Sequence, residues 1–253
     1  MSALVNQLVA QVIGLEVGLL SCQARLAAVT DDEALHDLRT TVRRLRSLLR
    51  PLRGLPCVEQ LELAASTVGQ LTTPLRDREV LAAYLHQHGY HDAADRRLRL
   101  QPEAYRQVAQ SPELAHLLLI LDAFPRFIRA SQHQKLLKGL RPRIQKRLAK
   151  QWQALDGALK DPDHDRHRLR LLIKRVRYAA EAYPELDKLP TNALSHLKKA
   201  QSALGNWHDC WQWLAQAGHE PDLQPCVAVW QRTMLKAQGK ADRVLDTLSA
   251  ECF

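Results

Sequence analysis

Two stretches of this 253-residue chain, HDLRTTVRRLR at 36–46 and HRLRLLIKRVR at 167–177, have the same pattern of residues. Each begins with a histidine, and basic residues then follow at intervals of three and four. The shared pattern is H-x-L-R-x-x-[VI]-[RK]-R-[LV]-R. Because it recurs after 131 residues, the pattern predicts an internal duplication into halves 1–131 and 132–253 that are related by a pseudo-twofold axis.

Helical geometry separates each stretch into an apolar and a basic face. At about 100° per residue, Leu38, Val42 and Leu45 form a stripe for the core. The first basic stripe lies beside it and comprises His36, Arg39, Arg43 and Arg46. The second basic stripe comprises His167, Arg170, Lys174 and Arg177. Arg44 and Arg175 fall about 80° to the other side and are predicted to be flank positions.

A charge run is often only a solvated helix face, but such faces usually mix positive and negative residues. Like charges four residues apart destabilise a helix by about 0.2–0.5 kcal/mol per pair. Here Arg39/Arg43 and Arg170/Lys174 are such pairs, and acids are absent from 38–58 and from 166–180. Two such stripes in one register predict a surface that binds an external anion.

The spacing within a stripe suggests the kind of anion. Cations three and four residues apart rise by about 5.4 Å per turn, so they can follow an extended chain of phosphates. Arginine offers forked donors to phosphate oxygens. A bound polyanion also favours protonated histidine, so binding is expected to strengthen toward mildly acidic pH. A secondary set of anion-binding candidates comprises Arg44, Arg50, Arg175, Arg141 and Lys199.

Apolar residues recur at helical spacing along almost the whole chain, and no stretch alternates like a strand, which predicts an all-α fold. Pro74 and Gly89 are expected to break helices. The predicted helices are 2–29, a second that begins at about 36 and stops near Pro51 or Gly54, 57–71, 76–88, 102–110, 113–131, 134–160, 165–183, 191–204, 208–217 and 222–249.

Composition narrows the class of protein. A net charge of +9 suggests a polyanionic partner: nucleic acid, anionic lipid or a phosphate polymer. We find no run of about 18 apolar residues that could span a membrane and no basic start of a secretory signal, so a cytoplasmic protein without a membrane partner is expected. Five widely spaced cysteines predict reduced thiols. The oligomeric state is left open.

The remaining histidines and aromatic residues predict no metal or cofactor. His164 and His167 lack further ligands, and the HQHGYH segment at 86–91 is better explained as a polar turn than as a zinc site. No glycine-rich phosphate loop occurs. Three tryptophans are expected in the core of the second half, namely Trp207, Trp211 and Trp213. The basic run at 135–150 is equally compatible with a solvated face and with an extension of the anion site.

The duplicated basic helices resemble those of the CHAD domain, the conserved histidine α-helical domain. The second copy continues into Tyr178 and Glu181, similar to the family's RY-x-x-E ending, and LKKAQSALGNWHD at 197–209 resembles a later family segment. The first half departs from that segment with Thr72-Thr73 in place of Leu-Gly. Arg76-Asp77 of the first half corresponds to His208-Asp209 of the second, and the two aspartates are expected to cap or pair.

The resemblance implies two helical bundles whose basic helices line a central groove or pore. It also implies binding of inorganic polyphosphate by the residues of both stripes, often on polyphosphate granules in bacteria. No E-x-E-x-K motif of an associated triphosphatase occurs, so a binding module without enzymatic activity is expected. A basic helical nucleic-acid binder is the alternative. Only Tyr178 among the aromatics is expected near the stripes, which disfavours base stacking.

Overall fold

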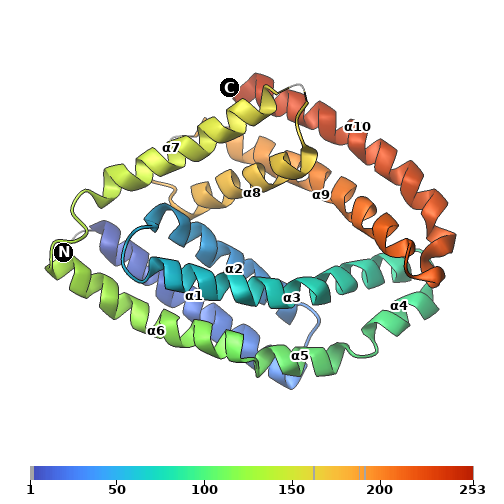
Figure 1. Cartoon of the computed structure of the whole chain (residues 1–253), viewed down its shortest axis with the longest axis horizontal. Coiled ribbons are helices and arrows are strands. Elements are labelled where there is room, and N and C mark those ends of the chain that lie inside the picture. The colour runs from blue at the N-terminus through green and yellow to red at the C-terminus, as the bar shows by residue number, and fades with distance from the viewer. Residues whose placement is uncertain (1–2, 162, 188, 191, 253) are drawn as a thin grey trace. The chain divides into compact units, whose positions relative to one another are not determined.

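In the computed structural model, residues 3–161, 163–187, 189–190 and 192–252 are described, and every regular element within them is a helix (Figure 1). The prediction of an all-α fold is therefore confirmed. The chain divides between Arg143 and Ile144 into two compact units.

The first unit contains seven of the helical elements. They are α1 (Ala3–Ala28), α2 (Ala34–Leu49), the 3-10 turn η1 (Arg50–Leu52), α3 (Val58–Gln87), α4 (His91–Leu98), α5 (Gln101–Ala109) and α6 (Pro112–His133). α1 packs against α2, α5 and α6, and α3 packs against α2, α4 and α6. The apolar stripe predicted for α2 lies in the core, where Leu38, Leu45 and Leu49 are fully buried.

The turn after α6 stays with the first unit, so the structural boundary lies beyond residue 132. Leu137 and Leu140 line a pocket together with Val5 of α1. Nη2 of Arg143 donates a hydrogen bond to the carbonyl oxygen of Arg53 at 2.7 Å.

The second unit contains most of α7 (Leu140–Leu159), followed by α8 (Arg166–Ala182), α9 (Ala193–Ala217), the 3-10 turn η2 (Pro221–Cys226) and α10 (Val227–Cys252). α9 packs against both α8 and α10. The core is built from apolar residues of α7, α8, α9 and α10, including Leu155, Ile173, Leu204 and Leu248. α8 begins at an N-cap in which the Asp165 carboxylate accepts a hydrogen bond from the His167 amide.

Pro74 does not end a helix, and this corrects the prediction of separate helices at 57–71 and 76–88. α3 continues through it. The proline removes one backbone donor, but the preceding turn gains hydrogen bonds. Thr73 Oγ1 donates to the Gly69 carbonyl at 2.7 Å, and Thr72 Oγ1 donates to the Val68 carbonyl at 2.8 Å.

Three other predicted boundaries also differ. The helices predicted at 191–204 and 208–217 are one helix, α9, because the internal Gly205 costs only about 1 kcal/mol. The helix predicted from residue 134 begins at Leu140, because Lys135 and Gly139 adopt left-handed backbone with φ of 60° and 74°. The short helix α4 was missed by the sequence analysis.

α1 is long and apolar enough to cross a membrane by length and composition, with a mean hydropathy of 1.6 over its most apolar window. This corrects the sequence reading that no segment could do so, which counted only uninterrupted apolar residues. Core helices of soluble proteins and N-terminal signal sequences share the property. In the structure, one side of α1 is buried, including Leu8, Val12 and Leu19.

Candidate anion-binding surfaces

The first basic stripe lies on α2, on the side of the helix that approaches α3. His36, Arg39, Arg43 and Arg46 are half-buried, whereas the predicted flank residue Arg44 is exposed. A methyl group added at Gly69 of α3 would lie 3.7 Å from Nη1 of Arg46, so this guanidinium reaches α3. The Nε of Arg46 is buried without a hydrogen-bond partner within the described part of the chain.

Arg39 joins α2 to α3. Its Nη1 donates to Thr72 Oγ1 at 2.9 Å, to Thr73 Oγ1 at 3.0 Å and to the Gly69 carbonyl at 3.1 Å. Burial lowers the pKa of Arg39, and the nearby Asp77 carboxylate partly offsets that effect. The Thr72-Thr73 pair, which the sequence marked only as a departure from the family pattern, therefore provides hydroxyl acceptors for the first arginine of the stripe.

Arg76 belongs to a buried network on α3 and α5. Its Nη1 lies 2.9 Å from Oε2 of Glu79, which is 9% exposed. The Tyr105 hydroxyl donates to Oε1 of Glu79 at 2.6 Å. Asp77 lies in the middle of α3 and acts electrostatically on Arg39. The proposed capping role of Asp77 is therefore wrong, because α3 does not begin there.

The second basic stripe lies on α8, which packs against α9. His167 is exposed, Arg170 and Lys174 are half-buried, and the flank residue Arg175 is exposed. Arg177 is held by its own helix. Its Nη1 lies 3.0 Å from Oε1 of Glu181, its guanidinium lies 4.1 Å from the ring centroid of Tyr178, and its side chain is only 13% exposed.

His208 of α9 extends the second stripe. Its ring centroid lies 5.3 Å from that of His167, and it is 7% exposed. Burial, together with the charges of Arg170, His167 and Lys174, lowers the pKa of His208 to about 4. His208 is therefore neutral at neutral pH. Asp209 also lies inside a continuous helix, so its proposed capping role is wrong as well.

Trp211 is not a core residue, which corrects the sequence analysis. It is 52% exposed and stacks on His208, with ring centroids 5.8 Å apart and an interplanar angle of 16°. Trp213 is buried and packs against Trp230. Tyr178 is thus not the only aromatic residue beside a basic stripe. The i, i+3 spacing of His208 and Trp211 in the sequence was the available signal.

The low pKa of His208 makes stability depend on pH. Its ordinary value is 6.5, so between pH 6.5 and about 4 the unfolded state binds the proton more readily. We expect the free energy of unfolding to fall by on the order of 3 kcal/mol as pH drops through this range. Asp187 has the opposite effect, because burial raises its pKa to about 6.

Urea unfolding at several pH values isolates the contribution of His208. The decrease in stability on acidification should be smaller in His208→Gln than in the parent protein, since Asp187 is unchanged in both. Parallel pH curves for the two proteins would contradict the assignment.

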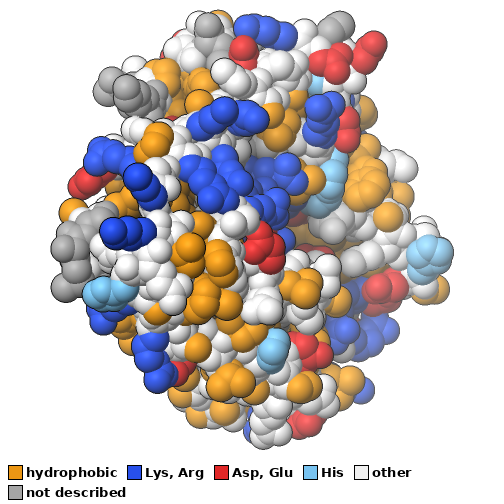
Figure 2. Space-filling view, turned by 60° about the vertical axis from the view of Figure 1, so that its left-hand side comes forward, with side chains coloured by type: hydrophobic (Ala, Val, Ile, Leu, Met, Phe, Trp, Pro, Cys, Tyr) orange, Lys and Arg blue, Asp and Glu red, His pale blue; other side chains and the backbone are white. Residues whose placement is uncertain are grey.

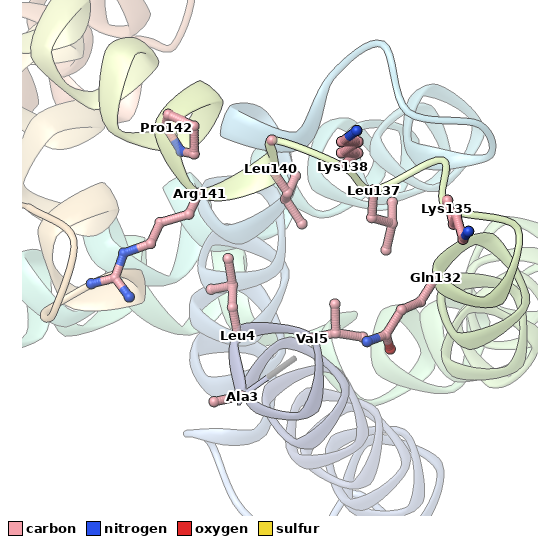
Figure 3. Close-up of a pocket in the computed structure, with 11 residues that line it drawn as sticks. Ala3, Leu4, Val5, Gln132, Lys135, Leu137, Lys138, Leu140, Arg141 and Pro142 are labelled. Atoms are coloured by element: carbon pink, nitrogen blue, oxygen red, sulfur yellow. The ribbon is translucent and has the colours of Figure 1, made fainter. Parts of the chain in front are cut away.

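The secondary candidates lie in different surroundings. Lys199 is exposed and lies about 180° around α9 from His208. Arg141 lines a pocket of about 590 Å³ with Leu4, Leu137 and Leu140. Figure 3 shows the three leucines directed into this space and the Arg141 guanidinium directed away from it.

Figure 2 shows Lys and Arg side chains exposed on the part of the surface in view. No group of three or more His, Cys, Asp or Glu side chains that could hold a metal occurs among the residues described. The arrangement offers half-buried cations on helix faces, and such cations can form charge-assisted hydrogen bonds with anions.

Comparison with known proteins identifies the fold. A family model for the CHAD domain matches residues 16–217. The chain belongs to the CHAD domain family. Its structure is similar to the crystal structure of the CHAD domain from the plant Ricinus communis, with a TM-score of 0.75 and 24% sequence identity. The match covers 98% of this chain and 91% of that chain. A comparison with curated proteins found no match.

Proposed function

We propose that this CHAD domain binds inorganic polyphosphate through the basic stripes of α2 and α8 and does not process it. The observation that carries the proposal is that the cations of each stripe are half-buried, and that each stripe contains a buried guanidinium nitrogen without a hydrogen-bond partner among the described residues. Nε of Arg46 and Nε of Arg177 are buried without partners in the portion of the chain described. Such donors are costly unless a ligand or water satisfies them.

The spacing of the cations favours a phosphate chain over a compact anion. Arg39, Arg43 and Arg46 occupy successive turns of α2, and Arg170, Lys174 and Arg177 do the same on α8. Each step rises by about 5.4 Å, so an extended polyanion can contact several cations along one helix. In this arrangement Arg39 mainly positions the stripe, and Arg43 and Arg46 are the principal contacts.

The repeated sequence supports two equivalent binding faces. We propose that both halves contribute to binding and that the protein binds polyphosphate in the cytoplasm, including on polyphosphate granules. The central groove expected from the family resemblance stays a prediction.

Long-chain polyphosphate should bind more tightly than RNA or duplex DNA of matched charge at the same salt concentration. The logarithm of the binding constant should fall linearly with the logarithm of the salt concentration, because bound counterions are released. Fluorescence anisotropy with labelled ligands measures both. Equal or tighter binding of nucleic acid would favour the alternative of a nucleic-acid binder. Shortening of the polyphosphate on long incubation would contradict a purely binding role.

A further inference from the structure

An exposed aromatic platform lies at one end of the α8 stripe. Trp211 stacks on His208, whose ring is 5.3 Å from that of His167, the first residue of the stripe. Trp211 and His167 are both exposed, and His208 is buried between them. An apolar flat surface therefore continues directly into a row of cations.

The directions of α8 and α9 determine the order in which Trp211, His167 and the cations lie along this surface. The connection between Ala182 and Ala193 is short, and His208 of α9 lies beside the first turn of α8, so the two helices are antiparallel. Trp211 lies one turn beyond His208 on α9 and therefore extends past the start of α8. Along the surface, the indole comes first, followed by His167, Arg170 and Lys174 on successive turns.

The first half of the chain lacks this platform. When Arg76-Asp77 is aligned with His208-Asp209, Trp211 falls on Glu79. Half-buried Arg76 and buried Glu79 form an ion pair, and the Tyr105 hydroxyl donates to the other oxygen of the carboxylate. The same i, i+3 positions thus hold an ion pair in one unit and, in the other, a buried histidine stacked against an exposed tryptophan.

This combination matches a ligand with an aromatic ring joined to a phosphate chain. Nucleobases stack on exposed indoles, and arginine and lysine bind the phosphates. Backbone amides at the start of α8 are less suited to this task, because the Asp165 carboxylate already accepts from the His167 amide at 2.8 Å. The phosphates must be held by side chains.

We propose that the α8–α9 face binds nucleoside polyphosphates, with the base on Trp211 and the phosphates on His167, Arg170 and Lys174. The inference rests on the proposed function, because it uses the same cations. A single nucleotide is favoured over a nucleic-acid strand, since successive bases require successive platforms. Beside the stripe, Tyr178 is buried beneath the Arg177 guanidinium, and Trp207 is only half-buried with its ring 6.3 Å from that of His208.

The test compares two ligands that differ in the base. Adenosine triphosphate and inorganic tripolyphosphate are titrated by calorimetry, without metal and at matched salt, into the parent protein, Trp211→Ala and Trp211→Phe. Trp211→Ala should lower the affinity for adenosine triphosphate by about tenfold, as expected for the loss of one base–aromatic stack. Its affinity for tripolyphosphate should stay within about twofold of that of the parent protein. Trp211→Phe should retain most of the affinity for the nucleotide.

The controls separate the two proposals. Lys174→Gln should weaken the binding of both ligands. If Trp211→Ala weakens the binding of both ligands equally or of neither, the nucleotide site is overturned and the proposal that the domain binds polyphosphate still stands. If the parent protein binds the nucleotide in a Trp211-dependent manner but does not bind tripolyphosphate or polyphosphate, the proposed function fails and the nucleotide site stands. A larger effect of Trp211→Ala on single-stranded RNA than on the nucleotide would assign the platform to a strand and overturn the inference.

Discussion

Reversing one central cation in each stripe, with Arg43→Glu and Lys174→Glu together, should weaken the binding of long-chain polyphosphate by at least about 100-fold at moderate salt. Each substitution removes charge-assisted hydrogen bonds to phosphate and adds repulsion. Both side chains are half-buried on the faces that approach α3 and α9, respectively. Fluorescence anisotropy with labelled polyphosphate measures the loss.

The chain offers a matched control for this variant. Arg44→Glu and Arg175→Glu make the same change in net charge on the same two helices, at exposed flank positions. We expect the affinity of this control for polyphosphate to fall by less than about tenfold, because long-range attraction is reduced but the cations of the stripes are unchanged. Circular dichroism should show unchanged helical content in both variants. If the two double variants lose affinity equally, binding depends on overall charge and the assignment of the stripes is wrong.

A milder pair, Arg43→Gln and Lys174→Gln, separates loss of attraction from added repulsion. It should also lower the magnitude of the salt slope by about one for each phosphate contact removed. An unchanged slope would show that these two side chains do not contact phosphate.

Replacing Arg39 should affect folding as well as binding. In Arg39→Met, the contacts of Nη1 with Gly69, Thr72 and Thr73 are lost, and Asp77 loses a compensating charge. We expect the free energy of unfolding to fall by about 2–3 kcal/mol, since hydrogen bonds to a charged donor are among the stronger ones. Chemical unfolding in urea, followed by circular dichroism, measures the change.

Arg44→Met provides the comparison for Arg39→Met. It removes an arginine from the same helix at an exposed position, where substitutions usually change stability by less than about 0.5 kcal/mol. Equal stability of Arg39→Met and the parent protein would refute the positioning role. The charge-reversal experiment avoids Arg39 for this reason, because a variant that fails to fold would give no information on binding.

The sequence determined the helical class, the faces of α2 and the two basic stripes. These features depend on the periodicity of side chains along one helix, and periodicity is a local property. Leu38 and Leu45 are buried as predicted, and Arg44 and Arg175 are exposed as their helical angles require. The family model also confirmed the resemblance to the CHAD domain. The motifs that carry this resemblance are short segments of single helices, so they too can be recognised from local sequence.

Tertiary structure decided which cations have partners within the protein. Arg39, Arg43 and Arg46 are indistinguishable by spacing, but contacts with α3 make Arg39 a link between helices. The surroundings of His208 and the exposure of Trp211 likewise depend on where α9 meets α8. Helical angles give the direction of a side chain around its own axis. The residues that meet it there come from distant segments, and their packing fixes burial, charge and hydrogen bonding.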